Sequence, residues 1–435
     1  MKKYKIVILV CAFTLLGIFT CRVSKTSNVY EENENNQMKK QVNTISMMLE
    51  TEAGSGKYEM TTRDSWPTEG YVFNSTLSKC ENGGELSWDD TNKKVLMSGN
   101  ISDKCYVYFD IETKVFLADY VKSLYTGTQR DNNIYYHDSS LENGAGDNSY
   151  RYAGSSETTN NYVCFGSDAD TCPEDNLYRI IGVFDGKVKL IKSTGTTNTL
   201  LGTDGTYTSN SRSYTWTDLD SCPSTTAYKF DNNVVVLSNK NILGAVPGGG
   251  KSGGCNMWKY SNLNSVNLNT NFITNLGIKW AALVDNATWK VSGYSTANVT
   301  AKTMYTAEIT NATKTYGPSD GTSKIGLMYA SDYGFAASPS AWTTLLSSYN
   351  DSSIKSTNWI YNAGMEWTMT PYSSDSYSVF ILSYVSTVSN TGNLGTWSSL
   401  GADAGFDTRP AMYLNASVVY TRGSGTASDP IRIEI

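Results

Sequence analysis

Few side chains in this sequence have a type and spacing suited to catalysis. His137 is the only histidine among 435 residues, so a Ser-His-Asp triad would need it as its base. We expect His137 in an exposed loop and not as the base of such a triad. Gly248-Gly-Gly-Lys-Ser252 matches only the end of a phosphate-binding loop, because Ala245 stands where the motif needs glycine. The sequence therefore predicts no catalytic residues and no cofactor.

Four carboxylates are weak candidates for metal ligands. They lie in and just after the segment between Cys164 and Cys172, where alternating carboxylates would suit Ca²⁺. Their spacing is not that of an EF-hand, so we expect a solvated acidic turn. The four residues are Asp168, Asp170, Glu174 and Asp175.

Six cysteines lie outside the apolar N-terminal segment, which itself holds Cys11 and Cys21. An even number predicts disulfide bonds formed in an oxidising compartment. Proximity along the chain favours the pairs Cys80 with Cys105, Cys164 with Cys172, and Cys222 with Cys255. Zinc is not expected, because the sequence has no Cys-x-x-Cys pair and one histidine.

The stretch 371–400 combines aromatic side chains with Ser, Asn and Gly, a composition typical of binding surfaces. Tyrosine and tryptophan faces stack on sugar rings or anchor protein interfaces. Trp367, just before this stretch, is expected in the core, and Arg409 is expected to pair with a buried carboxylate or carbonyl. The candidate ligand-binding residues are Tyr372, Tyr377, Tyr384 and Trp397.

Short strands must position these residues. We expect strands at 367–370 and 410–414 to pair and to hold 371–400 as a surface loop. A hairpin is predicted at 178–191, where Asp185-Gly186 supplies a tight turn between two apolar strands. Helical periodicity is present at 112–125, 263–276 and 297–309. This mixture predicts an α+β domain over residues 113–435.

A smaller module precedes this domain. Residues 58–112 contain strand patterns at 71–73, 85–88, 94–97 and 106–109, separated by turn residues. A module of this size has a thin core, so a Cys80–Cys105 bridge would contribute about 3 kcal/mol to its stability.

A polar stalk is expected before the module, at residues 26–57. Met38, Val42, Ile45 and Leu49 in this stalk recur at helical spacing and predict an amphipathic helix.

Residues 1–25 predict export. Three early lysines precede the apolar run 6–21, which would span roughly 24 Å as a helix, less than the hydrocarbon core of a bilayer. An uncleaved signal anchor, a cleaved signal peptide and a lipoprotein signal all remain open. The charge distribution places the body of the protein outside the cell in each case, either as a single-pass protein of the cell membrane or as a secreted one.

Two motifs carry a family resemblance. Glu366-Trp-Thr-Met-Thr-Pro-Tyr-Ser373 and Asp407-Thr-Arg-Pro-Ala-Met-Tyr-Leu414 resemble the paired "W-x-L-R/T-x-P" and "V-R-P-x-x-Y-L" pattern of C-type-lectin-like domains. The segments 148–154, 160–184 and 324–338 resemble the same family, which includes surface proteins of Firmicutes and shares its fold with formylglycine-generating enzymes. That enzymatic chemistry needs cysteines in the C-terminal part of the fold, and the last cysteine here is Cys255. The resemblance therefore implies a fold without that activity.

Composition excludes one class of partner. The net charge is −6 and the basic residues are scattered, so nucleic acid is not expected. We hypothesise a membrane-anchored bacterial surface protein whose large domain binds a surface glycan or a protein and catalyses nothing. A structural or adhesive envelope component and a glycan hydrolase are the alternatives, the second of them disfavoured.

Overall fold

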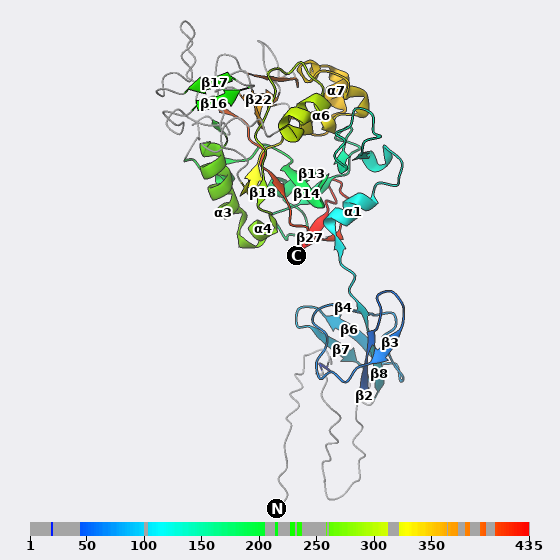
Figure 1. Ribbon diagram of the computed structural model, residues 1–435. Helices are drawn as coiled ribbons and strands as arrows, with labels where there is room; N and C mark the ends of the chain where they lie inside the picture. Colours follow the sequence, from blue (N-terminus) through cyan, green and yellow to red (C-terminus); the bar gives the residue numbers. More distant parts are fainter. Residues whose placement is uncertain are drawn as a thin grey trace, which may run out of the picture. The chain divides into compact units, whose positions relative to one another are not determined.

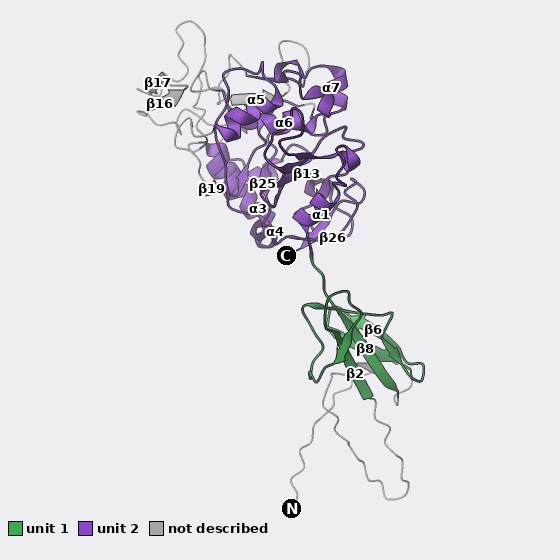
Figure 2. Cartoon of the chain, turned by 45° about the vertical axis from the view of Figure 1, so that its right-hand side comes forward, with its two compact units in different colours: residues 1–114 green, residues 115–435 purple. Residues whose placement is uncertain are grey.

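A computed structural model divides the chain into two compact units, Met1–Lys114 and Val115–Ile435 (Figures 1 and 2). The residues described are 19–20, 44–99, 103–204, 214–215, 227–230, 233–236, 258, 261–311, 322–362, 364–372, 379–382, 392–396 and 405–434. Strands predominate over short helices, so the expectation of a mixed fold is confirmed at this level.

The first unit contains two sheets around a small core. One sheet has the strand order β3-β2-β8-β4, with β5 also paired to β8, and the other has the order β1-β7-β6. Met47, Trp66, Val95, Val107 and Phe109 form the core. All four strands predicted for residues 58–112 are present. The strands are β1 (Phe19–Thr20), β2 (Thr44–Glu50), β3 (Tyr58–Met60), β4 (Tyr71–Phe73), β5 (Lys79–Cys80), β6 (Glu85–Asp89), β7 (Lys94–Ser98) and β8 (Lys104–Ile111).

The helix predicted through Ile45 and Leu49 is wrong. These residues lie in β2, which runs parallel to β8 with Ile45 opposite Cys105. A spacing of four residues is shared by a helix face and by one face of a strand, because strand side chains alternate with a period of two. Ile45, Met47 and Leu49 therefore all contact the core from one face of β2. Met38 and Val42 lie outside the described residues.

A disulfide joins two strands of the first unit. Cys80 on β5 is bonded to Cys105 on β8, and the two residues are direct partners in the ladder. Asp103 lies beside them and accepts backbone hydrogen bonds from Asn82 (2.8 Å) and Gly84 (3.0 Å). Although these three residues could in principle hold a metal ion, both sulfurs are used by the bridge.

The second unit is organised around an antiparallel sheet of order β10-β11-β13-β14-β25-β20, with β12 also paired to β13. The predicted hairpin is confirmed, since β13 and β14 are joined by Asp185 and Gly186, both with positive φ. Gly182 on β13 permits close packing, because a Cβ there would lie 2.2 Å from the Tyr150 carbonyl oxygen of β11. These strands are β10 (Ile134–His137), β11 (Ser149–Tyr152), β12 (Tyr162–Cys164), β13 (Leu177–Phe184), β14 (Lys187–Lys192), β20 (Ile325–Gly326) and β25 (Ala411–Tyr413).

Short helices accompany this sheet, and Figure 1 shows α6 and α7 on one side of the β13–β14 hairpin and α3 and α4 on another. The helix predicted at 263–276 is present as a π-helical segment, Leu263–Phe272, that continues into α3. The one predicted at 297–309 begins at Ala301 and continues as a π-helical segment, Thr306–Thr310. The helices are α1 (Leu117–Ser123), α2 (Asn198–Leu201), α3 (Ile273–Leu276), α4 (Ile278–Leu283), α5 (Ala301–Tyr305), α6 (Ala330–Ala336) and α7 (Ser352–Ser356).

The two ends of the second unit meet in a small sheet. Val115 and Phe116 form β9, which pairs with β26 (Val419–Arg422), and β26 pairs with β27 (Arg432–Glu434). The predicted helix at 112–125 is therefore shorter than expected, because its first apolar residues are used by a strand. No helix within the described ranges is long and apolar enough to cross a membrane. The predicted membrane segment 6–21 lies outside those ranges except for Phe19 and Thr20.

The expected pairing of strands 367–370 and 410–414 is wrong. Strand β21 (Glu366–Pro371) pairs with β22 (Val379–Leu382), which pairs with β23 (Leu394–Thr396), whereas β25 lies between β14 and β20. Arg409 nevertheless links the two segments, because its Nε donates to Glu366 Oε1 at 2.6 Å and its Nη2 donates to the Ile360 carbonyl oxygen. The predicted structural role of Arg409 is confirmed. So is the core position of Trp367, which is 2% exposed.

The remaining strands are short. They are β15 (Tyr214–Thr215), β16 (Ala227–Phe230), β17 (Asn233–Val236), β18 (Ala287–Thr288), β19 (Thr322–Ser323) and β24 (Gly405–Phe406).

Candidate functional site

A cavity of about 220 Å³ opens where the central sheet of the second unit meets the start of α6. Strands β11, β14 and β25 contribute Arg151, Lys189 and Tyr413, and α6 contributes Ser331 and Asp332. Asp185, in the hairpin turn, also lines the cavity and is exposed to solvent. The cavity therefore combines solvent access with side chains that are themselves buried.

Four charged residues form a network on the cavity wall, here called the cavity cluster: Asp147, Arg151, Lys189 and Asp332. Arg151 Nη2 donates to Asp147 Oδ2 at 2.7 Å, and its Nε donates to Ser149 Oγ at 2.8 Å. Arg151 Nη1 lies 3.5 Å from Asp332 Oδ1. Two cations and two carboxylates thus balance one another within the cluster.

Lys189 and Asp332 form the most buried pair of this cluster. Lys189 Nζ donates to Asp332 Oδ2 at 2.6 Å, and the side chains are 1% and 3% exposed. The same carboxylate oxygen accepts the Tyr329 backbone N–H, which caps the first turn of α6. The ammonium group also lies 4.5 Å from the centre of the Tyr329 ring. Burial lowers the pKa of Lys189, although the charge of Asp332 opposes this shift.

Asp147 is held in its ionised form. Burial disfavours the charge, but the Arg151 guanidinium and hydrogen bonds from Ser149 and Tyr305 outweigh it, so the pKa of Asp147 is well below its usual range. The Tyr305 hydroxyl donates to Asp147 Oδ2 at 2.7 Å. This carboxylate is therefore occupied by neighbours and is a poor proton acceptor.

Ser331 lines the cavity, and its hydroxyl oxygen is buried. The residue is 1% exposed, and Oγ makes no hydrogen bond of standard geometry to a described residue, although it lies close enough to Glu308 to lower the pKa of that carboxyl. Glu308 is fully buried behind it and accepts a hydrogen bond from the Ser331 backbone N–H at 3.3 Å. Burial raises the pKa of Glu308 to about 8, against hydrogen bonds from Ser331 and Thr370 that lower it. Glu308 is therefore protonated at neutral pH.

Strand alternation explains how these charges come to lie inside. Ser149 and Arg151 point to one face of β11, and Tyr150 points to the other. In β14, Lys189 and Lys187 are two residues apart and therefore project from the same face of the strand. The Lys187 ammonium pairs with Asp285 at 2.6 Å, and the Lys187 side chain is 41% exposed. The sequence pattern alone does not distinguish Lys189 from Lys187, because both alternate with apolar residues.

The expectation of an exposed loop histidine is wrong. His137 ends β10, is fully buried, and lies 5.1 Å from the ring centres of both Phe335 and Trp342. Its Nδ1 accepts the Ala145 backbone N–H at 3.0 Å. Burial, and secondly the charge of Arg151, lower the pKa of His137 well below its usual value. Polar neighbours in the sequence hid its inward-facing position at the end of a strand.

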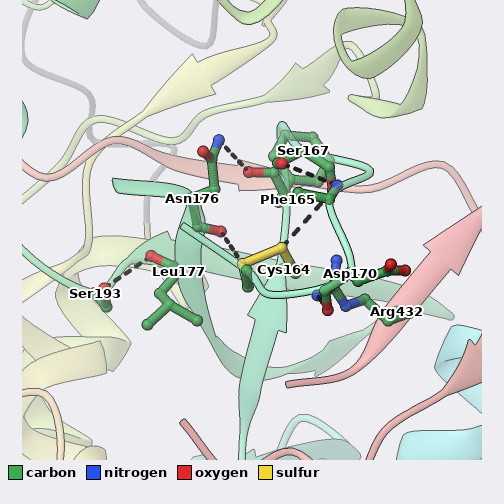
Figure 3. The surroundings of a disulfide bond; sticks show 10 residues. Cys164, Phe165, Ser167, Asp170, Asn176, Leu177, Ser193 and Arg432 are labelled. Atoms are coloured by element: carbon green, nitrogen blue, oxygen red, sulfur yellow. Dashed lines mark hydrogen bonds between the residues drawn. A yellow bond between two sulfur atoms is a disulfide. The ribbon is translucent and has the colours of Figure 1, made fainter. Parts of the chain in front are cut away.

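The acidic segment 168–175 gathers no metal-binding group of three ligands within the described residues. Asp168 pairs with Lys279 at 2.6 Å, and Asp175 lies 3.7 Å from Lys192. Figure 3 shows Arg432 beside Asp170, whose carbonyl oxygen accepts a 2.7 Å hydrogen bond. Glu174 begins a short 3₁₀ turn, Glu174–Asn176. The weak metal candidates are therefore dispersed over separate contacts.

Two predicted disulfides are confirmed. Cys164 and Cys172 are bonded at 2.03 Å (Figure 3), and Cys80 and Cys105 are bonded as described above. The Asn176 carbonyl oxygen lies 3.6 Å from Cys172 Sγ, and the Asn176 amide donates to the Phe165 carbonyl oxygen, so the loop closes on itself. Cys222 and Cys255 lie outside the described residues.

Of the four aromatic residues predicted to bind a ligand, Tyr372 alone lies among the described residues. Tyr372 follows β21, is partly buried and packs against the main core. Tyr377, Tyr384 and Trp397 lie outside the described residues, so their role stays a prediction. The Gly248–Ser252 segment also lies outside.

Sequence reasoning missed the cavity cluster. Its members come from segments near residues 150, 190 and 330, and no motif connects them. No local signal marked Lys189, because β14 mixes lysines with apolar residues in the sequence Lys-Val-Lys-Leu-Ile-Lys. Long-range packing had to bring these segments together before a site existed.

No protein-family model, curated protein or solved structure matches this chain. The resemblance to C-type-lectin-like domains therefore stays a prediction from the motifs quoted above.

Proposed function

We propose that this protein is a cell-surface binding protein whose second unit binds a small, neutral, hydroxyl-rich ligand, such as one sugar unit of a glycan, in the cavity beside Ser331. The observation that carries the proposal is that Ser331 lines the cavity and that its buried hydroxyl makes no hydrogen bond of standard geometry to a described residue. A buried hydroxyl without such a bond costs free energy, so rotation of the side chain toward a bound molecule or water in the cavity would be favourable. A ligand hydroxyl can act as both donor and acceptor there.

The charge balance favours a neutral ligand. Arg151 and Lys189 are already paired with Asp147 and Asp332, so an additional charged group would compete with ion pairs of 2.7 and 2.6 Å. A hydroxyl group leaves those pairs intact. It can donate to Asp332 Oδ1, whose nearest described partner, Arg151 Nη1, is 3.5 Å away.

The aromatic lining and the volume of the cavity both suit a sugar ring. Tyr305, Tyr329 and Tyr413 line the cavity, and tyrosines combine an apolar face with a polar edge. The volume of about 220 Å³ suits one ring rather than a long oligosaccharide. The proposal includes two expectations from the sequence. The first is that this unit has a C-type-lectin-like fold, and the second is that the body of the protein lies outside the cell.

Binding without hydrolysis is the favoured form of this function. Glycoside hydrolysis uses two carboxyl groups that flank the scissile bond, one as acid and one as base or nucleophile. Asp147 is occupied by Arg151, Ser149 and Tyr305, while Glu308 is buried behind Ser331 and does not line the cavity. Asp332, which also lines the cavity, is paired with Lys189, so Asp185 is the one lining carboxyl without an ion pair among the described residues, and hydrolysis needs two.

Glycan-array screening followed by calorimetry on the full chain tests the proposal. We expect a saturable sugar ligand whose affinity falls at least about tenfold in Ser331→Ala, because a bidentate hydroxyl contact is lost. Thr344→Ala, which changes a separate surface groove, is the matched control and should bind normally.

Two results would overturn the cavity as the binding site. One is unchanged affinity in Ser331→Ala. The other is loss of binding in Trp397→Ala alone, which would move the site to the stretch 371–400. Release of reducing sugar by the wild-type chain would instead support the hydrolase alternative.

A further inference from the structure

Lys189 and Asp332 form an ion pair, but the same two groups, an amine and a carboxyl, can also react with each other. The two residues are 143 positions apart in the sequence, yet Nζ lies 2.6 Å from a carboxylate oxygen. Rings surround the amine, with the centres of Tyr329, Trp289 and Tyr413 at 4.5, 5.4 and 5.5 Å. An amine and a carboxyl group are thus in contact beside several aromatic rings.

Burial makes the charged forms of this pair costly. Removing an ammonium and a carboxylate from water carries a large desolvation penalty, which their mutual attraction repays only in part. Transfer of one proton from Lys189 to Asp332 produces a neutral amine and a carboxylic acid in contact. In water, solvation of the two ions opposes condensation of an amine with an acid, and this opposition is weaker for two side chains that are 1% and 3% exposed.

We propose that Lys189 and Asp332 condense to an intramolecular amide, in which Nζ is bonded to Cγ and one carboxyl oxygen leaves as water. The lone pair of the neutral amine forms the N–C bond, and the C–O bond breaks with its electron pair on the departing hydroxyl. One proton reaches that hydroxyl, and one proton is lost from the nitrogen. The step needs no oxidant, reductant or activated co-reactant.

One neighbour, Arg151, can stabilise the developing charge. Arg151 Nη1, 3.5 Å from Asp332 Oδ1, can stabilise the oxyanion that forms when Nζ attacks Cγ. Glu308 makes no described contact with Nζ or with the Asp332 carboxyl. The proton that leaves the nitrogen can pass directly to the departing hydroxyl, because Nζ lies 2.6 Å from Asp332 Oδ2. The water formed has an exit, because Lys189 and Asp332 line the cavity.

This bond is independent of the proposed ligand. An amide retains an N–H donor and a carbonyl acceptor at the cavity wall, so sugar binding can fail while the bond forms, and the reverse also holds. The bond would close a loop through the core sheet and α6, which resists unfolding of the unit.

Mass spectrometry of the purified full chain, with its disulfides reduced, tests the proposal directly. We expect a mass lower than the sequence mass by one water molecule. Trypsin should yield segment 188–192, uncleaved after Lys189, joined to segment 325–355, which contains Asp332. A cooperatively folded wild-type chain with its full sequence mass, or a link between other residues, overturns the proposal.

Variants identify the roles of the residues. Lys189→Ala should retain its full mass, whereas Lys187→Ala, which changes the exposed neighbour on the same strand, should still lose one water. Asp332→Asn should lose ammonia in place of water, because the amide nitrogen becomes the leaving group. Loss of water from Lys189→Ala contradicts the assignment.

Discussion

The second unit contains two groups of buried charge that are built differently. In the cavity cluster, Lys189 has one hydrogen-bonded partner among the described residues, and the nearby Ser331 hydroxyl has none. The other group, here called the core cluster, consists of Arg179, Glu366 and Arg409, each at most 3% exposed. The guanidinium of Arg179 alone donates four hydrogen bonds, to Asn161, Ser156, Trp359 and Thr159.

The contrast shows how buried charge can serve either the fold or a site. Arg179 donates to two backbone carbonyls and two side-chain oxygens, so it joins segments of the fold and has little left to offer a ligand. Burial lowers the pKa of Arg179 to about 10, and it still carries its charge at neutral pH. The cavity cluster keeps unused donors and acceptors beside open space. Four predictions test this contrast, beginning with the largest effect.

Arg409→Ala should lower the free energy of unfolding by about 3–5 kcal/mol, because it leaves the buried Glu366 carboxyl unpaired. Glu366 Oε2 already lacks a hydrogen-bond partner among the described residues, and burial raises the pKa of this carboxyl against the opposing charge of Arg409. Denaturant titration gives the measurement. Arg422→Ala, at an exposed arginine, is the control and should change stability by less than about 0.5 kcal/mol. Equal stability in the two variants would remove the structural role assigned to the core cluster.

The second prediction concerns pH. The pKa of Glu308 is raised in the folded protein from 4.5 to about 8, so the folded state binds this proton more tightly than the unfolded state does. The resulting stabilisation is fully present below pH 4.5 and is lost as pH rises to about 8. Stability measured across this window should therefore fall with pH, by an amount on the order of a few kcal/mol. Glu308→Gln should flatten the profile, and an equally steep profile in that variant would contradict the assignment.

Ser331→Ala should change the free energy of unfolding by no more than about 1 kcal/mol, and in the stabilising direction, because it removes a buried hydroxyl that lacks a partner. The affinity for the sugar ligand should fall at least about tenfold in the same variant. Thermal unfolding beside calorimetry separates the two effects. A large loss of stability would mean that this hydroxyl belongs to the packing of the fold and not to a site.

The smallest effect is expected in the acidic segment. Lys279→Ala removes the ion pair with Asp168, whose two side chains are 60% and 65% exposed, and should cost less than about 0.5 kcal/mol. Addition of Ca²⁺ or of a chelator should leave the thermal unfolding curve unchanged. A calcium-dependent shift that disappears in Asp168→Ala would restore this segment as a metal site.

Several features were determined by the sequence through local physical chemistry. The β13–β14 hairpin follows from two apolar runs around Asp185-Gly186, because turn chemistry acts between neighbours along the chain. The bridges Cys80–Cys105 and Cys164–Cys172 join cysteines close in sequence. Trp367 in the core and Arg409 beside a buried carboxylate were predictable from residue type, since a buried charge must find a partner.

Tertiary structure decided the rest. Residues 44–50 became a strand because β8 offered a parallel partner, although their four-residue spacing fits a helix equally well. Strands β21 and β25 entered different sheets, and His137 turned inward, through contacts that no local pattern encodes. Lys189 and Asp332, 143 residues apart, meet only when β14 and α6 pack together. The spacing of apolar residues indicates which face of a helix or strand is buried. Which element packs against that face depends on the packing of the whole domain.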